Sequence, residues 1–394
     1  MFNVQTKYFS VSKTLLLAVG LWPYQQSNFT RFQFIFLSTI LTTQVIFQFA
    51  VFISQRCTPL LITKVLSPGL ACTILVIKYN MFFVNVKTVK DLLEQLVDMC
   101  NKLKDENEFA IINEYGCDSI RYTKLLIVIG ISSIFLCTFA SLWSEILDII
   151  LPTNVSRSHN FLIMTEYFID QQKYFYIILV HFILSIAIGI AVIIAISAML
   201  ITYFQHICGM LKIASYRIER AMNINILQNI NEMKYIFIHE GLICAVNIHR
   251  QAMNLCLDML SCIETMLFCL IIFGVLMMSI TLFQIFQILS IEGDIKECLV
   301  PFIVALFSVA YMFVSNYIAQ TIMNHNEHIF ITAYNVKWYI APLCIQKMTL
   351  FLLQRSSKNF NLNVGGLFNG SIETFATLVK TSVSYFTVIY STQK

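Results

Sequence analysis

The sequence predicts an all-α membrane protein that crosses the bilayer seven times. Of its 394 residues, 58% are hydrophobic and only 12% are charged, about half the charged fraction of an average soluble domain. Several apolar runs are long enough to cross the hydrocarbon core of a bilayer as helices. Helices are the expected form because lipid offers no partner to an unpaired backbone N–H or C=O group.

Seven segments have the length and apolar character of membrane spans. They are, in chain order, Phe32–Ser54, Leu60–Phe82, Lys124–Asp148, Phe175–Tyr203, Glu264–Ser290, Cys298–Gln320 and Ile372–Thr392. Pro68, Pro152 and Pro301 lie in or at the ends of these spans, where membrane helices tolerate a kink. No internal repeat is visible, which argues against an inverted-repeat transporter.

Lysine and arginine collect on one side of this predicted topology. Most lie in the N-terminal segment and in three long connections, residues 84–123, 204–263 and 321–371, whereas Lys78 and Lys380 fall inside spans. Positive charge stays on the cytosolic side, so we expect a cytosolic N-terminus and an extracellular C-terminus. A G-protein-coupled receptor has the opposite orientation. The net charge of +4 is small and gives no indication of nucleic-acid binding.

The first two long connections carry apolar residues at helical spacing. In the 84–123 connection, Val89, Leu92 and Leu96 recur between charged residues, and Leu211 and Ile218 do so in the 204–263 connection. These segments are therefore expected to extend the membrane helices into the cytosol. Their apolar stripes would pack on each other or partly on another subunit.

The last span differs from an ordinary lipid-facing helix. Ile372–Thr392 would cover about 31 Å, one bilayer core. Six of its residues share one helix face, and this face is mostly hydroxylated. They are Glu373, Thr377, Thr381, Ser384, Val388 and Ser391. Either the hydroxyls bond to carbonyls of their own helix inside a packed bundle, or the face lines an aqueous pore with Val388 as a hydrophobic constriction.

Large apolar residues cluster in the outer halves of the middle spans. Each alone is explained by ordinary packing or an interfacial aromatic belt, but together they could line an apolar ligand pocket. The candidates are Phe135, Thr138, Phe139 and Trp143 on the third span, Tyr176 and Phe182 on the fourth, Ile280 and Phe283 on the fifth, and Phe307 and Tyr311 on the sixth. The polar groups expected there are Thr138, Ser141, Ser308 and the Tyr311 hydroxyl.

The sequence offers little support for an enzyme or for a metal site. There is no Gly-rich phosphate loop, HExxH or GxSxG motif, so we expect no enzyme and no cofactor. His325 and His328 could share a helix face, as a solvated helix end or as a metal pair, and the first is favoured. Of three glycosylation sequons, only Asn154 would face outward. The scattered cysteines predict no disulfide framework.

The C-terminal run from Ala333 to Ile389 resembles the signature of the insect odorant receptors. The matching elements are Tyr334 with Trp338 and Tyr339, Arg355 with Ser356, Gly366 before Phe368, and Lys-Thr-Ser-x-Ser-Tyr-Phe-Thr-Val from Lys380 to Val388. Two features depart from the family pattern. Asn359 and Phe360 follow Lys358 where the family often has proline, and Gly365–Gly370 carries an extra Asn-Gly.

The resemblance implies an odorant-gated, non-selective cation channel of four subunits in the plasma membrane of olfactory sensory neurons. The family's co-receptor is longer, with a large insertion between the fourth and fifth spans that is absent here, so the chain looks like a ligand-tuned member. Such a member pairs with the odorant receptor co-receptor in a heterotetramer, binds small volatile ligands and conducts cations. The alternatives are a metabotropic seven-helix chemoreceptor coupled to G proteins and a gustatory-type receptor channel.

The resemblance also assigns residue roles. Residues 1–320 would form a six-helix bundle with cytosolic extensions at 84–123 and 204–263. Residues 321–371 would form a cytosolic anchor where subunits meet, and residues 372–394 would form the pore helix. The implied anchor residues are Tyr334, Trp338, Tyr339 and Arg355. The implied pore residues are Thr377, Thr381, Ser384, Val388 as the gate, Ser391 and Thr392.

Overall fold

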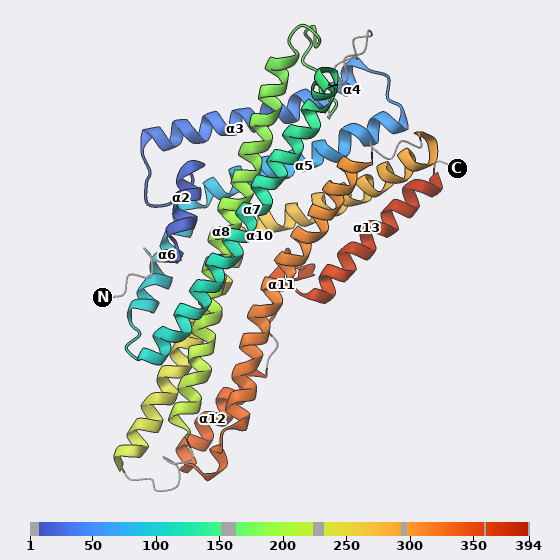
Figure 1. The fold of residues 1–394 in the computed structure, drawn as a ribbon. Helices are drawn as coiled ribbons and strands as arrows, with labels where there is room; N and C mark the ends of the chain where they lie inside the picture. Colours follow the sequence, from blue (N-terminus) through green and yellow to red (C-terminus); the bar gives the residue numbers. More distant parts are fainter. Residues whose placement is uncertain (1–7, 151–162, 224–231, 293–297, 358–359, 393–394) are drawn as a thin grey trace.

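The computed structural model describes residues 8–150, 163–223, 232–292, 298–357 and 360–392. These residues are almost entirely helical, with one short hairpin near the C-terminus (Figure 1). The elements are α2 Ser10–Ala18, α3 Asn28–Phe49, α4 Val51–Ser54, α5 Pro59–Val84, α6 Val86–Asn101, α7 Glu106–Ile150, α8 Phe175–Ala221, α10 Glu232–Gln287, the π-helical turn Ile288–Glu292, α11 Leu299–Asn335, the 3₁₀ turn Trp338–Ile340, α12 Leu343–Ser356, β1 Asn363–Val364, β2 Phe368–Asn369 and α13 Ile372–Thr392.

The seven predicted spans correspond to helices. Six helical segments are long and apolar enough to cross a membrane: Asn28–Ser54, α5, and the apolar parts of α7, α8, α10 and α11. The seventh span, α13, has the bounds that the sequence predicted and is a more polar helix. The prediction of an all-α, multi-pass membrane fold is confirmed, and the side of the membrane that each terminus faces stays a prediction.

Four helices continue well beyond the length of a bilayer. At 47 residues, α8 is about 70 Å long, more than twice the hydrocarbon core. In Figure 1 the start of α7, the end of α8, the start of α10 and the end of α11 gather with α12 at the lower end of the molecule, which we call the extended end. The polar connections expected to be helical are therefore built from these continuations and α6.

Helix α8 lies at the centre of the bundle and is the most deeply buried. It packs against α7, α10, α11, α3 and α2. Small residues along it permit this close packing: a side chain at Gly189 would meet Leu75 of α5 at 2.4 Å. Val192, Ala195 and Met199 of α8 are completely covered. The main hydrophobic core follows α8 into the extended end, so the extensions share one core with the membrane bundle.

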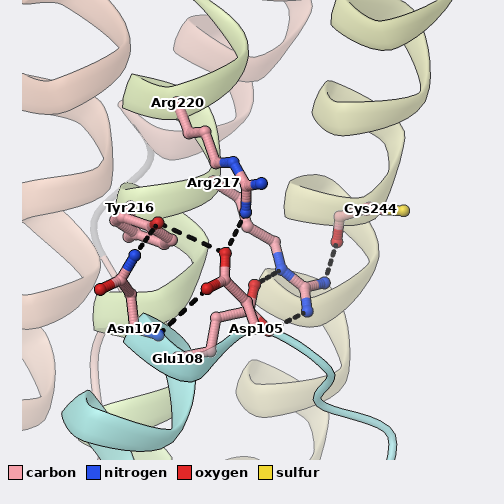
Figure 2. A network of polar contacts seen from close by, with 7 residues as sticks. All are labelled: Asp105, Asn107, Glu108, Tyr216, Arg217, Arg220 and Cys244. Atoms are coloured by element: carbon pink, nitrogen blue, oxygen red, sulfur yellow. Dashed lines mark hydrogen bonds and ion pairs between the residues drawn. The ribbon is translucent and has the colours of Figure 1, made fainter.

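A network of charged side chains joins α7 to α8 at the extended end (Figure 2). Arg217 binds Glu108 through two hydrogen bonds, Nε–Oε1 at 2.6 Å and Nη2–Oε2 at 2.9 Å. Arg220 pairs with Asp105, and Asn107 donates to the Tyr216 hydroxyl at 2.9 Å. The bond to Glu108 raises the pKa of Arg217, which lies beyond the predicted span. A bidentate arginine–carboxylate pair fixes both distance and orientation, so the network sets how α7 enters the bundle.

The N-terminal helix α2 packs on α8 around a buried histidine. The rings of Tyr8 and Phe9 lie 5.6 and 5.5 Å from the ring of His206, which is fully covered. His206 Nδ1 donates to the carbonyl of Thr202 at 2.7 Å, and its Nε2 has no hydrogen-bond partner in the described part of the chain. Burial lowers the pKa of His206 to about 4, so the ring is neutral at pH 7.

Removing the charge of Glu108 is expected to destabilise the fold. In Glu108→Gln, Arg217 loses the carboxylate that it binds through two hydrogen bonds, although only 22% of its side chain is exposed. We expect a loss of roughly 2–4 kcal/mol, because breaking one partner of a buried pair leaves the other uncompensated. The matched control is Asp118→Asn, which removes an exposed pair with Arg121 and should change stability by less than about 1 kcal/mol. Equal shifts in the thermal unfolding of the two purified variants would contradict this.

The burial of His206 predicts a loss of stability in acid. Its pKa falls from 6.5 to about 4 on folding, so the unfolded chain takes up the proton first as pH decreases. The contribution is therefore fully present above pH 6.5 and is lost as pH falls toward 4. We expect the unfolding temperature to drop between pH 7.5 and 5, and His206→Asn to reduce that drop. The control His239→Asn, a half-buried position on α10, should retain it.

Candidate functional site

The predicted pore helix α13 lies at the edge of the bundle, beside α10 and α11 (Figure 1). Leu378 and Ser382 are the buried residues of this helix, and they face α10 and α11. An adjacent, largely uncovered face of the helix carries the hydroxyl stripe. Its residues Thr377, Ser384, Val388 and Ser391 are exposed, and Thr381 is half-buried; the predicted pore residue Thr392 at the end of the helix is also exposed. Val388 has 55% of its surface uncovered by its own chain.

The hydroxyls of the stripe bond to their own helix. Thr377 donates to the carbonyl of Glu373 at 3.0 Å, Thr381 to Thr377 at 2.8 Å and Ser391 to Val388 at 2.8 Å. The bonds to carbonyls of the same helix that the first interpretation expects are therefore present at these three residues, whereas their face is not packed inside this chain, and the pore-lining interpretation stays a prediction. Each hydroxyl oxygen keeps lone pairs that can accept a bond from water or contact a cation.

Aromatic side chains hold the covered face of α13 against α10 and α11. Phe386 lies 6.5 and 6.1 Å from the rings of Phe283 and Phe286 on α10, and Tyr390 lies 4.8 Å from Phe286. Near the other end, Phe375 meets Phe313 of α11 at 5.4 Å. These ring contacts attach α13 to both α10 and α11.

A short hairpin fixes the start of α13. Its turn contains Gly365 and Gly366, both with positive φ (63° and 70°), a conformation that costs little only for glycine. The Gly365 N–H donates to the Glu264 carboxylate of α10 at 2.9 Å, and the Ser371 N–H donates to Asn316 Oδ1 of α11 at 3.2 Å. The hairpin thus ties α13 to both helices. It includes the Asn-Gly that departs from the family pattern.

The structure describes nine of the ten predicted pocket side chains, and these differ in how far their own chain covers them. Phe182 and Phe283 are buried, whereas Thr138 and Ile280 are half-buried. Phe135, Phe139, Tyr176, Phe307 and Tyr311 are exposed on the single chain. Trp143 and the sequon at Asn154 lie outside the side chains that the structure describes. Phe283 contacts Phe386 of α13, so this position links the predicted pocket to the pore helix, and the pocket itself stays a prediction.

The predicted anchor residues lie at the extended end. Tyr334 and Tyr339 are 64% and 61% exposed, and Arg355 is also exposed, while Trp338 packs partly on the main core. Apolar residues around them are likewise uncovered: Ile340, Leu343, Leu350 and Phe351. This apolar surface on α12 and the preceding turn has no partner in the described part of the chain.

His325 and His328 belong to the helix packing. The Nε2 atom of His325 lies 2.6 Å from the Tyr115 hydroxyl of α7, and the Nδ1 atom of His328 lies 3.3 Å from the Ser215 hydroxyl of α8. The favoured interpretation as a solvated helix end was therefore incomplete, since both rings bond across helices. Among the residues described, no three metal-ligating side chains come together.

Sequence reasoning missed the role of Lys78 on α5. It noted only that this residue falls inside a span, yet the side chain is 1% exposed and bonds to residues of two other helices. Its Nζ donates to the Ser197 hydroxyl of α8 at 2.9 Å and to the Tyr311 hydroxyl of α11 at 3.0 Å. A charged residue within an apolar span is itself a signal of function, and it could have been used.

Comparison with protein families shows which family the chain belongs to. A family model described as the seven-transmembrane odorant receptor matches residues 58–383, which is most of the chain. The chain belongs to the odorant receptor family. The recognition made from the C-terminal motifs is thereby confirmed. No curated protein matches the chain.

Solved structures of an insect odorant receptor share the fold. The olfactory receptor OR5 of Machilis hrabei in complex with eugenol matches with a TM-score of 0.72 over 98% of each chain, at 13% sequence identity. A second structure of the same receptor matches with a TM-score of 0.69 over 97% of each chain, at 14% identity. At 13–14% sequence identity, this likeness shows that the chain has the same fold as these two structures.

The two turn glycines give a matched test of how the hairpin positions α13. Both have positive φ, so alanine at either costs about 1–2 kcal/mol of backbone strain. At Gly365 the added Cβ would also lie 2.3 Å from the Phe268 ring, whereas at Gly366 nothing lies within 4 Å. We expect Gly365→Ala to lower the unfolding temperature further than Gly366→Ala does. Equal effects in the two purified variants would show that the contact with α10 is unimportant.

Proposed function

We propose that this odorant receptor is a subunit of an odorant-gated, non-selective cation channel whose pore is lined by α13. The observation that carries the proposal is the exposed hydroxyl stripe of that helix, interrupted by Val388. A polar face in a membrane helix must meet protein or water, because hydrocarbon gives its hydroxyls no further partner. Copies of α13 from several subunits, arranged around an axis, satisfy that requirement with water between them.

The second support comes from the uncovered apolar surface at the extended end. Tyr334, Tyr339 and Phe351 are each more than half exposed, and such a surface on a soluble extension is normally covered by a partner. We assign it to contact between subunits of a tetramer. The neighbours are copies of the odorant receptor co-receptor, in the plasma membrane of olfactory sensory neurons.

The ligand is a small volatile, mostly apolar molecule that binds within the membrane bundle. The OR5 structure that shares this fold was obtained with eugenol, a small aromatic molecule. With about 10 heavy atoms at roughly 0.6 kcal/mol each, the binding free energy is about −6 kcal/mol, equivalent to a Kd of tens of micromolar. An apolar pocket discriminates by only about 1–3 kcal/mol per methylene, so broad tuning is expected.

Gating follows from the contacts of α10 and α11. A ligand opens the channel only if it binds the open state more tightly than the closed state. Phe283 of α10 belongs to the predicted pocket and also touches Phe386 of α13. A shift of α10 and α11 on ligand binding would therefore carry α13 with it, turning Val388 away from the axis and exposing Ser384 and Ser391 to the permeating cations.

The proposal predicts that Val388→Ala produces a leak. The full-length chain is expressed with the co-receptor in a heterologous cell, and whole-cell current is recorded without and with a panel of volatiles. Truncating the constriction removes the hydrophobic barrier to water and ions, so the standing current should rise several-fold. The matched control is Val383→Ala, since Val383 is also exposed on α13 but lies outside the hydroxyl stripe. It should leave the closed channel tight.

The same recording separates the channel from a metabotropic receptor. Current that persists when G-protein signalling is blocked supports the channel. Current that disappears under that block would reject it in favour of coupling to G proteins. If Val388→Ala left the closed channel as tight as Val383→Ala does, the gate assignment would be wrong.

A further inference from the structure

Lys78 is a buried positive charge without a counter-ion. Its side chain is 1% exposed, enclosed between α5, α8 and α11. The partners of its Nζ atom are the Ser197 and Tyr311 hydroxyls, at 2.9 and 3.0 Å, and the Tyr311 ring, whose centroid lies 4.9 Å away. No carboxylate of the described chain forms an ion pair with it.

The usual reasons for a lysine in a membrane helix do not account for this one. A lysine near a helix end normally extends its ammonium group to the polar boundary, but Lys78 is covered and turned toward two other helices. Hydroxyl dipoles and an aromatic face stabilise a cation less than a carboxylate does. One of the three ammonium N–H groups has no partner among the described residues, so the site can accept one more oxygen.

A second buried polar group lies on α11, one turn before Tyr311. The Ser308 hydroxyl is buried and has no hydrogen-bond partner among the described residues. Ser308 precedes Tyr311 by three residues on α11, so the two share a helix face. A buried hydroxyl without a partner is costly and calls for an additional group in the native protein.

The Tyr311 side chain separates this site from the outside. Its ring is 38% exposed, while its hydroxyl reaches the covered ammonium of Lys78. Phe307, one turn earlier on α11, is 41% exposed and continues the apolar surface toward the start of that helix. Rotation of the Tyr311 ring would open the ammonium group to a molecule lying along this surface.

We propose that Lys78, with the hydroxyls of Tyr311 and Ser308, forms a binding site for the carboxylate of an acid with an apolar tail. One carboxylate oxygen accepts from the free N–H of Lys78, and the other accepts from the hydroxyls of Ser308 and Tyr311. The tail lies along Phe307. The inference rests on the proposed ligand-binding function, because Tyr311 also belongs to the predicted pocket, and it names one chemical class of ligand.

The test is binding of decanoate to the purified full-length receptor in nanodiscs of zwitterionic lipid, with 1-decanol as the neutral analogue and empty nanodiscs for partitioning. We expect saturable decanoate binding at least about tenfold tighter than that of the alcohol, since a charge-assisted hydrogen bond is worth roughly twice a neutral one. Lys78→Met should abolish this preference and Lys78→Arg should retain most of it. The control Lys87→Met removes an exposed positive charge at the start of α6 and should change nothing.

Two further variants keep the test decisive if Lys78→Met does not fold. Tyr311→Phe keeps the ring and Ser308→Ala keeps the helix, and each should weaken decanoate binding several-fold while leaving decanol unchanged. Decanoate that binds no better than decanol, or an acid preference that survives in the folded variants, would overturn the proposal. Hexanoate and palmitate then separate the two sources of such an acid, a volatile odorant and a membrane fatty acid.

The binding assay is independent of channel activity. Acid binding that requires Lys78, without any evoked current, would reject the channel and leave the site in place. Current evoked by neutral volatiles, together with no acid preference in binding, would reject the site and leave the channel in place.

Discussion

The absence of hydrogen-bond partners in hydrocarbon is the constraint on which this structure depends. It requires helices, and it requires polar side chains in them to find bonds within the protein. Buried pairs meet the requirement between α5 and α10, where Ser67 and Thr281 lie 2.7 Å apart and Thr63 donates to Gln287 at 3.0 Å. Among the described residues the requirement is only partly met at several places, which include Gln44 and Gln48 of α3, Ser308 of α11, the ammonium of Lys78 and the uncovered stripe of α13. We locate function at the stripe and at Lys78 with its neighbours on α11.

Local patterns predicted the elements well where the pattern was complete within a short stretch. The bounds of α13 follow from its apolar run and from Ser371, whose hydroxyl accepts the N–H of Thr374 at the helix start. The span predicted to begin at Lys124 is part of a helix that begins at Glu106, which agrees with the expected helical extension but whose starting residue was not predicted. Hydrophobicity does not detect that polar first part, because it is stabilised by contacts with the distant residues Tyr216 and Arg217.

The candidate site was likewise predictable from the sequence only in part. The stripe on α13 could be predicted because spacing within one helix defines a face. The setting of Lys78 could not be, since its partners Ser197 and Tyr311 are distant in sequence and meet it only in the packed bundle. The burial of His206 beneath the N-terminal helix also depends on residues distant in sequence, so it could not be predicted either. Sequence identifies which residues are unusual for lipid, and tertiary packing decides what each of them contacts.

The length of α8 has a mechanical consequence. One continuous helix of about 70 Å carries Ser197 in the membrane bundle and Arg217 in the network with α7. A rigid rod of that length acts as a lever: a tilt of about one degree at one end moves the other by about 1 Å. Helices tilt when the bilayer becomes thinner or thicker. Membrane thickness is therefore a physical input to the geometry of the extended end, independent of any ligand.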